Sequence, residues 1–204
     1  MSIESIKKKS LEDHIPIIMD DTLEVIKEIL IKEKPVRILE IGTATGYSSI
    51  CFATILLENC VGENSASIVI DTIELDETRA NEAIKNISNM KLEKTINVHI
   101  GNAVELLPEF NEKYDIIFID AAKGKYPIFL KEALRLSHKG TIILADNILY
   151  KGYVMSDYNK HKQRTAVTHL REYIKETTEN QKLETKILEV GDGLAVSKVK
   201  EVIL

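Results

Sequence analysis

The sequence predicts one α/β domain built on a doubly wound, mostly parallel sheet. Apolar runs rich in Ile and Val alternate with longer amphipathic stretches, as in strand–helix repeats. The runs are nearly continuous in their apolarity, which is typical of parallel strands covered on both faces. A chain of 204 residues, 44% hydrophobic and 29% charged, suffices for one core. No repeat or Pro/Gly-rich linker divides it, so we expect residues 1–204 to form a single domain.

The expected elements alternate along the chain. Strands are expected at 36–41, 67–75, 95–100, 114–120, 140–146, 184–190 and 194–200. Residues 1–34 are expected to form an N-terminal helical segment, with a helix at 20–34. Further helices are expected at 47–58, 77–91, 103–107, 125–137 and 159–179. The short VGDGLA segment before the last strand predicts a hairpin, so that strand is expected to run antiparallel in a seven-stranded sheet. Ligands of such sheets bind beyond the carboxyl ends of the strands.

The first expected strand leads into a glycine-containing turn, with the sequence Glu40-Ile41-Gly42-Thr43-Ala44-Thr45-Gly46-Tyr47-Ser48. Its glycines allow a sharp turn and a close approach of backbone to ligand. The G-x-x-x-G spacing differs from the G-x-G-x-x-G of dinucleotide binders, which counts against a nicotinamide oxidoreductase. The following helix N-terminus can receive a carboxylate, although an ordinary strand–helix turn has the same pattern.

The second and third strands also end in polar residues. Glu74 ends the second strand, where a carboxylate can accept hydrogen bonds from both hydroxyls of a ribose. A solvent-exposed loop carboxylate is the alternative. Asn102 follows the third strand and can reach an adenine amine. A glycine turn and a ribose acid at neighbouring strand ends predict a nucleoside-binding cleft.

The fourth and fifth strands carry the sharpest signal. Asp120 follows the fourth strand, and Asp146 and Asn147 follow the fifth. If these strands are neighbours, three oxygen ligands converge, and hard oxygen ligands suit Mg²⁺, Mn²⁺ or Ca²⁺. The alternative is that Asp146 and Asn147 cap a turn. Lys123 lies beside this group in the sequence.

The distribution of apolar residues and the cysteine usage indicate a cytoplasmic protein without a membrane segment. The chain opens without the apolar stretch of a secretory signal, and no run approaches the length of a membrane span. Cys51 and Cys60 match no metal or redox spacing, as expected of buried or idle thiols in a reducing compartment. The net charge is −5, and the five histidines form no metal spacing.

The expected helix 159–179 carries a basic stripe, although a solvated helix face has the same pattern. The stripe consists of Arg164, Thr168, Arg171 and Lys175, while Val167, Leu170 and Ile174 are expected to face inward. Lys125 and Lys151 follow the two strands that carry the candidate metal ligands. Together these cations can contact phosphates of RNA.

The combined motifs EIGTATGYS, TIELD, GNA, FIDAAKGKY and ADNILYKG resemble those of the cation-dependent O-methyltransferases, the group that includes catechol and caffeoyl-CoA O-methyltransferases. The resemblance covers nearly the whole chain and implies a Rossmann-like S-adenosylmethionine (SAM) methyltransferase fold and an enzyme of class EC 2.1.1. DAAKGKY and DNILYKG are most similar to the bacterial branch that methylates 5-hydroxyuridine at the tRNA wobble position. The resemblance also implies a homodimer, and an N-terminal segment that packs over the cofactor and substrate side.

The resemblance implies roles for individual residues. It implies SAM contacts for Met19, Glu40, Gly42, Thr43, Gly46, Ser48, Glu74, Asn102, Ala103 and Asp120. Met19 fits core packing equally well, and Asn102 departs from the Asp that much of the family has. The metal ligands would be Asp120, Asp146 and Asn147, with Asp120 and Lys123 as the catalytic pair. Lys123 would be the general base or an electrostatic partner of the substrate.

The acceptor is the open choice. A catechol offers two adjacent oxygens to a metal, and 5-hydroxyuracil offers the same arrangement through its hydroxyl and carbonyl. Tyr150, Tyr153 and Tyr158 can wall a small-molecule site, whereas Lys125, Lys151, Arg164 and Arg171 favour tRNA. We predict tRNA, with a small catechol-like or hydroxycinnamoyl acceptor as the alternative. A non-catalytic nucleoside-binding module would have no use for Lys123 beside a metal set.

Overall fold

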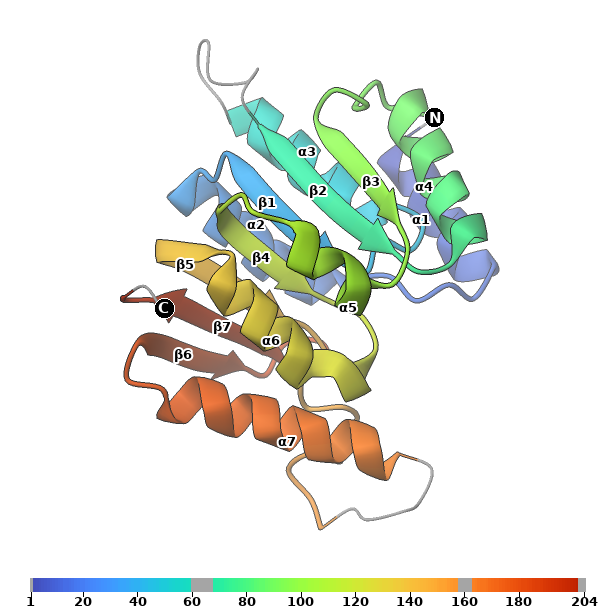
Figure 1. Cartoon of the computed structure of the whole chain (residues 1–204). Helices are drawn as coiled ribbons and strands as arrows, with labels where there is room; N and C mark the ends of the chain where they lie inside the picture. The colour runs from blue at the N-terminus through green and yellow to red at the C-terminus, as the bar shows by residue number, and fades with distance from the viewer. Residues whose placement is uncertain (1, 60–67, 158–162, 202–204) are drawn as a thin grey trace. The chain divides into compact units, whose positions relative to one another are not determined.

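The computed structural model describes residues 2–59, 68–157 and 163–201. The chain forms two compact units, Met1–Ala103 and Val104–Leu204. Its strands read β3-β2-β1-β4-β5-β7-β6 in a seven-stranded sheet (Figure 1). This order confirms the predicted doubly wound α/β class. The prediction of a single domain stays a prediction.

The first unit contains three parallel strands. They are β1 (Arg37–Ile41), β2 (Val69–Glu74) and β3 (Ile96–Ile100). β2 pairs with both others, with Ile73 opposite Ile41 and Glu74 opposite Ile100. The carboxyl ends of the three strands therefore lie at one edge, where the sequence places its polar motifs.

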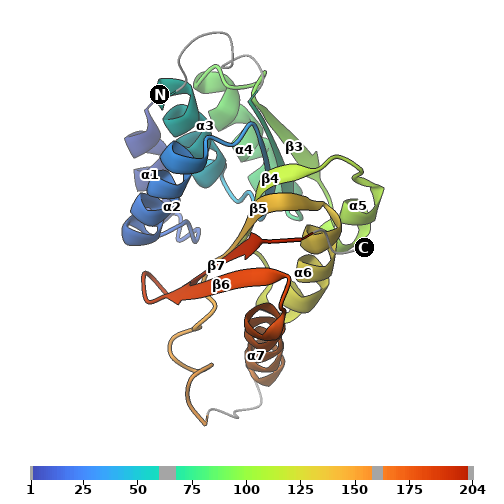
Figure 2. The same ribbon diagram turned by 90° about the vertical axis from the view of Figure 1, so that its left-hand side faces the viewer.

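Four helices lie on one side of these strands in the two ribbon views (Figures 1 and 2). They are α1 (Ile3–Glu12), α2 (Asp20–Glu33), α3 (Tyr47–Asn59) and α4 (Glu77–Asn89). Ser2 and Ser5 form a capping box that starts α1, and His14 has φ 54° where the chain leaves that helix. The predicted N-terminal helical segment is thus two helices with a break between them.

The second unit contains one antiparallel strand among four. Its strands are β4 (Tyr114–Ile119), β5 (Ser137–Ala145), β6 (Leu183–Leu188) and β7 (Leu194–Val199). β4 and β5 are parallel, whereas β7 runs antiparallel to both β5 and β6. The predicted antiparallel last strand is confirmed. The fourth and fifth strands are neighbours, which is the condition on which the predicted metal site depends.

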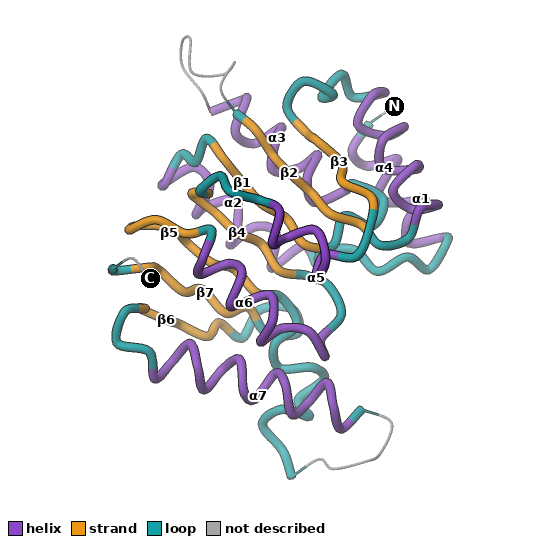
Figure 3. Tube along the Cα trace, in the orientation of Figure 1, coloured by secondary structure: helices purple, strands orange, loops and turns teal. Residues whose placement is uncertain are grey.

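The helical segments of the second unit are drawn in purple in Figure 3. They are α5 (Ala103–Leu106), the short 3₁₀ turns η2 (Leu107–Glu109) and η3 (Lys123–Lys125), α6 (Tyr126–Arg135) and α7 (Arg164–Glu179). α6 packs on β4 and β5, and α7 packs on β6, on α6 and on η3. Among the described residues, none of these or the earlier helices is long and apolar enough to cross a membrane.

Two element predictions need correction. β5 begins at Ser137 and not at 140, because Ser137 pairs with Tyr114 although this stretch carries no apolar signal. On α7, Tyr173 is fully buried, while Ile174 is half-buried and not the inward residue that was predicted. The Tyr173 ring meets the ring of Tyr126 edge-on, with centroids 5.6 Å apart. The start of the predicted helix, 159–162, lies outside the described residues.

Candidate active site

The turn between β1 and α3 is organised by the buried carboxylate of Glu40. Its side chain is 0% exposed. Ser48 Oγ donates to Glu40 Oε1 at 2.5 Å, Thr72 Oγ1 donates to Oε2 at 2.6 Å, and Ser49 Oγ also donates to Oε2. A buried carboxylate needs such donors, because water cannot solvate it. Glu40 therefore shapes the turn by fixing the start of α3, and its direct contact with a cofactor stays a prediction.

The glycines of this turn are required by its geometry. Gly42 has φ 108° and Gly46 has φ 81°, a region that side chains disfavour. A Cβ on Gly46 would also lie 3.2 Å from the Cβ of Ala83 on α4. The Gly46 N–H donates to the carbonyl of Thr43 at 2.9 Å, which closes the turn. The glycines thus allow the backbone conformation of the turn and its close packing on α4, and contact of this turn with a cofactor stays a prediction.

Glu74 ties the end of β2 to the same turn. Its Oε2 accepts the N–H of Ala44 at 2.8 Å, and its Oε1 accepts the N–H of Asp76 at 2.9 Å. Each carboxylate oxygen has two lone pairs, so both can also accept a ribose hydroxyl. The next residue, Leu75, is 70% exposed and was missed from the sequence. An exposed Leu at this edge offers apolar contact to a nucleoside base.

Asn102 and Ala103, which are also predicted to contact the cofactor, lie at the same edge. The Gly101 N–H donates to the carbonyl of Glu74 at 2.8 Å, which places Asn102 and Ala103 next to the end of β2. Met19, at the start of α2, is 50% exposed, so the alternative of core packing is wrong. At the ends of its parallel strands the first unit therefore presents a glycine turn, the carboxylate of Glu74 and the exposed Leu75, and the cofactor contacts stay predictions.

Helix α1 is bonded to the glycine turn. Ser10 Oγ lies 2.8 Å from Thr45 Oγ1, and both side chains are buried. Asn86 on α4 donates through Nδ2 to the carbonyl of Thr45 at 2.9 Å. The turn is therefore held by both α1 and α4. That the N-terminal segment packs over the cofactor and substrate side stays a prediction.

In the second unit, Asp120 and Asp146 follow paired strand ends. Ile119 and Ala145 are opposite each other in the β4–β5 ladder, and the Asp146 N–H donates to the Ile119 carbonyl at 3.0 Å. The Asp146 side chain is almost fully buried. Burial, followed by the negative charge of Asp120, raises the pKa of Asp146 to about 7. A cation bound at this point would offset the effect of the Asp120 charge on Asp146.

The side chains of Asp120, Asp146 and Asn147 carry oxygens of the type that a hard divalent cation prefers. Asp146 Oδ1 accepts the Asn147 N–H at 2.7 Å, and Asn147 adopts φ 55°, a conformation rare for residues with a side chain. Two carboxylates and one amide oxygen, completed by water and substrate, are a donor set for Mg²⁺. Within the described residues, no group of three His, Cys, Asp or Glu side chains is placed to hold a metal ion. The metal ligands Asp120, Asp146 and Asn147 stay a prediction.

Lys123 is held beside the acids by two hydrogen bonds. Its Nζ donates to Asp120 Oδ1 at 2.9 Å and to Tyr126 Oη at 2.9 Å. The Tyr126 hydroxyl in turn donates to the main-chain carbonyl of Asp146 at 2.7 Å. Burial raises the pKa of Tyr126 well above its usual range, so the phenol keeps its proton. Tyr126 was missed from the sequence because it reads as a core aromatic at the start of α6.

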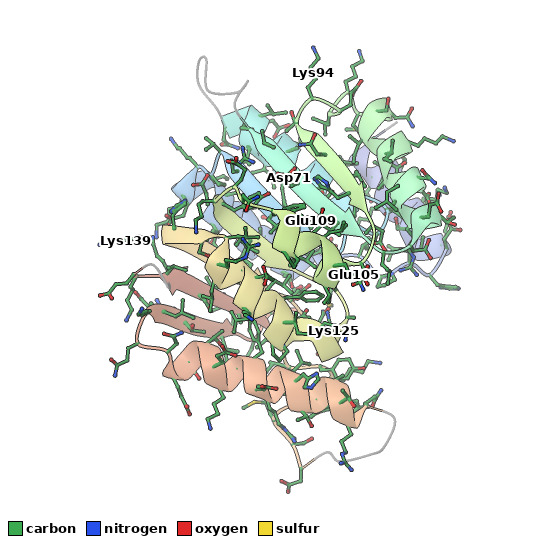
Figure 4. All side chains as sticks on the ribbon, viewed as in Figure 1. Asp71, Lys94, Glu105, Glu109, Lys125 and Lys139 are labelled. Carbon is green, nitrogen blue, oxygen red and sulfur yellow. The ribbon has the colours of Figure 1, made fainter. Side chains whose placement is uncertain are left out.

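The predicted RNA-binding cations divide into two groups. Lys125, labelled in Figure 4, is exposed before α6, and Lys151 and Arg164 are also exposed. Arg171 instead directs its guanidinium at three main-chain carbonyls of residues 153–156. Its guanidinium is therefore occupied by the protein itself.

Other candidate residues take structural roles. Cys51 is buried, as predicted, whereas Cys60, Tyr158 and His161 lie outside the described residues. His99 Nε2 lies 3.0 Å from Asp71 on β2, a residue labelled in Figure 4. His138 pairs with Asp115 and His169 with the carbonyl of Gly124.

Known proteins match this chain along nearly its whole length. A family model described as O-methyltransferase matches residues 28–200. A catechol O-methyltransferase from Niastella koreensis is 36% identical over 173 residues, covering 80% of this chain and 73% of that protein. A catechol O-methyltransferase from Sus scrofa is 29% identical over 161 residues, covering 74% and 81%.

Solved structures show the same fold. A structure from Staphylococcus aureus has a TM-score of 0.86 at 32% identity and covers 98% of this chain and 92% of that one. An O-methyltransferase from Bacillus cereus in complex with SAH has a TM-score of 0.84 at 25% identity, covering 97% and 90%. SAH is what remains of SAM after its methyl group has been transferred. The chain belongs to the O-methyltransferase family and is a SAM-dependent O-methyltransferase.

Proposed function

We propose that this enzyme binds a divalent cation, Mg²⁺ or alternatively Mn²⁺ or Ca²⁺, through Asp120, Asp146 and Asn147. We further propose that it methylates one hydroxyl of an adjacent oxygen pair. The observation that carries the proposal is the pair of acids at neighbouring strand ends, one of them buried with its pKa raised to about 7. Ionising the buried Asp146 beside Asp120 costs free energy when no cation is bound. With a cation bound, the two carboxylates would hold it where it can activate an acceptor hydroxyl.

The cation would lower the pKa of the acceptor hydroxyl and orient it for attack. Lys123 would then take the proton at Nζ. In its neutral form the amine has two N–H groups, and Asp120 and Tyr126 accept both. The nitrogen lone pair is thereby left for the proton of the acceptor. Lys123 is thus placed as a general base whose orientation is fixed before the substrate arrives.

The cofactor part of the proposal rests on the first unit. Glu74 would accept the ribose hydroxyls, Leu75 would contact the adenine, and Asn102 would hydrogen-bond its amine. The amino-acid end of SAM would lie along the turn that Gly42 and Gly46 form, near the N-terminus of α3. Methyl transfer from a sulfonium is an in-line displacement, so these contacts act by positioning the donor.

For the acceptor we propose 5-hydroxyuridine at the tRNA wobble position, in the cytoplasm. The exposed Lys125, Lys151 and Arg164 support this choice, because phosphates favour cationic surfaces. A small catechol is the second candidate. Tyr150 and Tyr153 meet edge-on with ring centroids 6.0 Å apart and offer an aromatic wall, and curated relatives are catechol O-methyltransferases. Both acceptors present the oxygen pair that the proposed metal site needs. The homodimer stays a prediction.

The test is methyl transfer from labelled SAM to tRNA that carries 5-hydroxyuridine and, in parallel, to a catechol. Each reaction is run with Mg²⁺ and with a chelator. Metal-dependent labelling of tRNA supports the full proposal. Labelling of the catechol in its place overturns the tRNA acceptor, and labelling that survives the chelator overturns the metal.

A further inference from the structure

The segment that follows the proposed metal ligand Asn147 is fastened at two places. We define residues 148–156 as the acceptor loop, because it continues directly from Asn147 and carries the tyrosines described above. The loop has no regular strand or helix. Tyr150 and Lys151 adopt φ 46° and 58°, which side chains disfavour. Contacts outside the loop must therefore hold this conformation.

The first part of the acceptor loop is held by the turn between β6 and β7. The N–H groups of Ile148 and Leu149 donate to the carbonyls of Gly193 and Asp192 at 3.0 and 2.9 Å. The Lys151 N–H donates to Asp192 Oδ1 at 2.6 Å. A Cβ on Gly193 would lie 2.9 Å from Leu149 Cβ, and Gly193 has φ 90°. The glycine is thus required for the turn to lie against the loop.

The second part of the acceptor loop is held by Arg171 of α7. Its Nε donates to the Val154 carbonyl at 3.0 Å, and its Nη2 donates to the Tyr153 carbonyl at 3.2 Å and to the Ser156 carbonyl. These bonds use the Nε–Nη2 edge, one of the edges with which a guanidinium grips a phosphate or carboxylate bidentately. Arg171, one of the cations in the stripe that was predicted to contact phosphates, is thus bonded within the protein.

We propose that Arg171 is a positioning residue that presets the acceptor loop and thereby strengthens binding of the acceptor. The inference rests on the proposed function, since it takes the loop after Asn147 to border the acceptor. Fixing Tyr153 and its neighbours in advance removes the entropy cost of ordering them when a substrate binds. Loss of the guanidinium loosens residues 153–156, while the Asp192–Gly193 turn continues to hold residues 148–151.

The test compares Arg171→Met with Lys175→Met. Methionine keeps the apolar stem and removes the charge in each case. Lys175 lies one turn further along the same exposed stripe and, within the described part of the chain, makes no hydrogen bond to the acceptor loop. It is therefore a matched control for the loss of one surface cation. Arg171→Lys is a third variant, which keeps the charge but replaces the planar fork of donors with a single nitrogen.

Amide hydrogen exchange measures how easily the acceptor loop opens. In Arg171→Met we expect the amides of Tyr153, Val154 and Ser156 to exchange about tenfold faster or more, since local opening becomes easier. The amides of Leu149 and Lys151 serve as an internal standard and stay unchanged. Lys175→Met behaves as wild type throughout. Unchanged exchange at 153–156 in Arg171→Met overturns the proposal, whatever the acceptor is.

Kinetics then separate positioning from phosphate binding. A preset loop predicts that Arg171→Met and Arg171→Lys raise the acceptor KM several-fold for a catechol and for tRNA alike. SAM affinity and kcat at saturating acceptor change little. Equal loss of tRNA affinity in Arg171→Met and Lys175→Met, with catechol KM unchanged, overturns the proposal and restores the phosphate stripe. If wild type methylates neither acceptor, the proposed function fails, while the exchange result still decides the positioning role.

Discussion

The hydroxyl of Tyr126 joins Lys123 to the main chain of Asp146. It accepts a hydrogen bond from Lys123 Nζ at 2.9 Å and donates one to the Asp146 carbonyl at 2.7 Å. The Lys123 Nζ also lies 5.1 Å from the centre of the Tyr126 ring. One buried side chain thus sets the place of the candidate base relative to a candidate metal ligand.

Tyr126→Phe removes this link without changing the ring. We expect kcat to fall about 10- to 100-fold, because a misplaced base loses most of its advantage. Unfolding free energy should drop by about 1 kcal/mol, the usual net value of one hydrogen bond. Steady-state kinetics and urea denaturation measure the two effects. A kcat equal to wild type would show that Lys123 does not depend on this contact, and Tyr173→Phe, which alters a neighbouring buried phenol, is the control.

The raised pKa of Asp146 predicts that Mg²⁺ binding strengthens with pH. In the metal-free protein the pKa is about 7, so the acid is mostly protonated at pH 6 and ionised at pH 8. A cation binds the ionised form, and its apparent affinity at pH 6 should be about tenfold weaker than at pH 8. Thermal melting with and without Mg²⁺ should show the larger shift at pH 8.

The raised pKa of Asp146 also determines how the stability of the metal-free protein changes with pH. The folded value of about 7 lies above the ordinary value of 3.8, so the folded state binds more protons and stability falls as pH rises between these values. Asp146→Asn should remove both this fall and the Mg²⁺-dependent shift in melting. A shift of equal size in Asp146→Asn and wild type would rule out Asp146 as a ligand.

Glu74→Gln tests the ribose contact in the first unit. An amide presents one acceptor oxygen where the carboxylate has two, and those two already receive the N–H groups of Ala44 and Asp76. We expect SAM affinity to fall about 10- to 100-fold, the value of one or two hydrogen bonds to a charged group. Isothermal titration calorimetry measures the dissociation constant for SAM in each variant. Asp76→Asn, at the exposed start of α4, should bind SAM as wild type does.

Cys51 should be inert in the folded protein. Burial raises the pKa of its thiol to about 12, from an ordinary value of 9.0, so very little thiolate exists at pH 8. In a Cys60→Ser background, alkylation at pH 8 should be at least about 100-fold slower for the folded protein than in urea. Rapid labelling under native conditions would show that the thiol is reachable. Because the folded pKa is raised, increasing pH to 9 should accelerate the reaction without making it fast.

Much of the fold was predictable because its signals are local. The Ile- and Val-rich runs mark all seven strands, and the order of strands and helices predicts the doubly wound sheet. The glycines at 42 and 46 mark the turn after β1. Asp120, Asp146 and Asn147 were recognisable because they follow apolar runs directly, and the ends of neighbouring parallel strands share an edge.

Other features depend on partners far along the chain. Arg171 appears in the sequence as one cation of a stripe, and its bonds to residues 153–156 depend on where α7 packs. Tyr126 appears as a core aromatic, and its hydroxyl acquires a role when β5 brings the Asp146 carbonyl to it. Glu40 appears in the sequence as a cofactor-binding residue, and in the structure its carboxylate accepts hydrogen bonds from three hydroxyl groups.

The sequence by itself determined the main elements, their order along the chain and the strand ends that carry the candidate site residues. Tertiary structure decided which polar groups bond to one another there. The physical reason is that strand and helix formation follows the periodicity of neighbouring residues, whereas a hydrogen bond requires two groups within about 3 Å. For groups distant in sequence, such as Lys151 and Asp192, that distance is set by the packing of the whole unit.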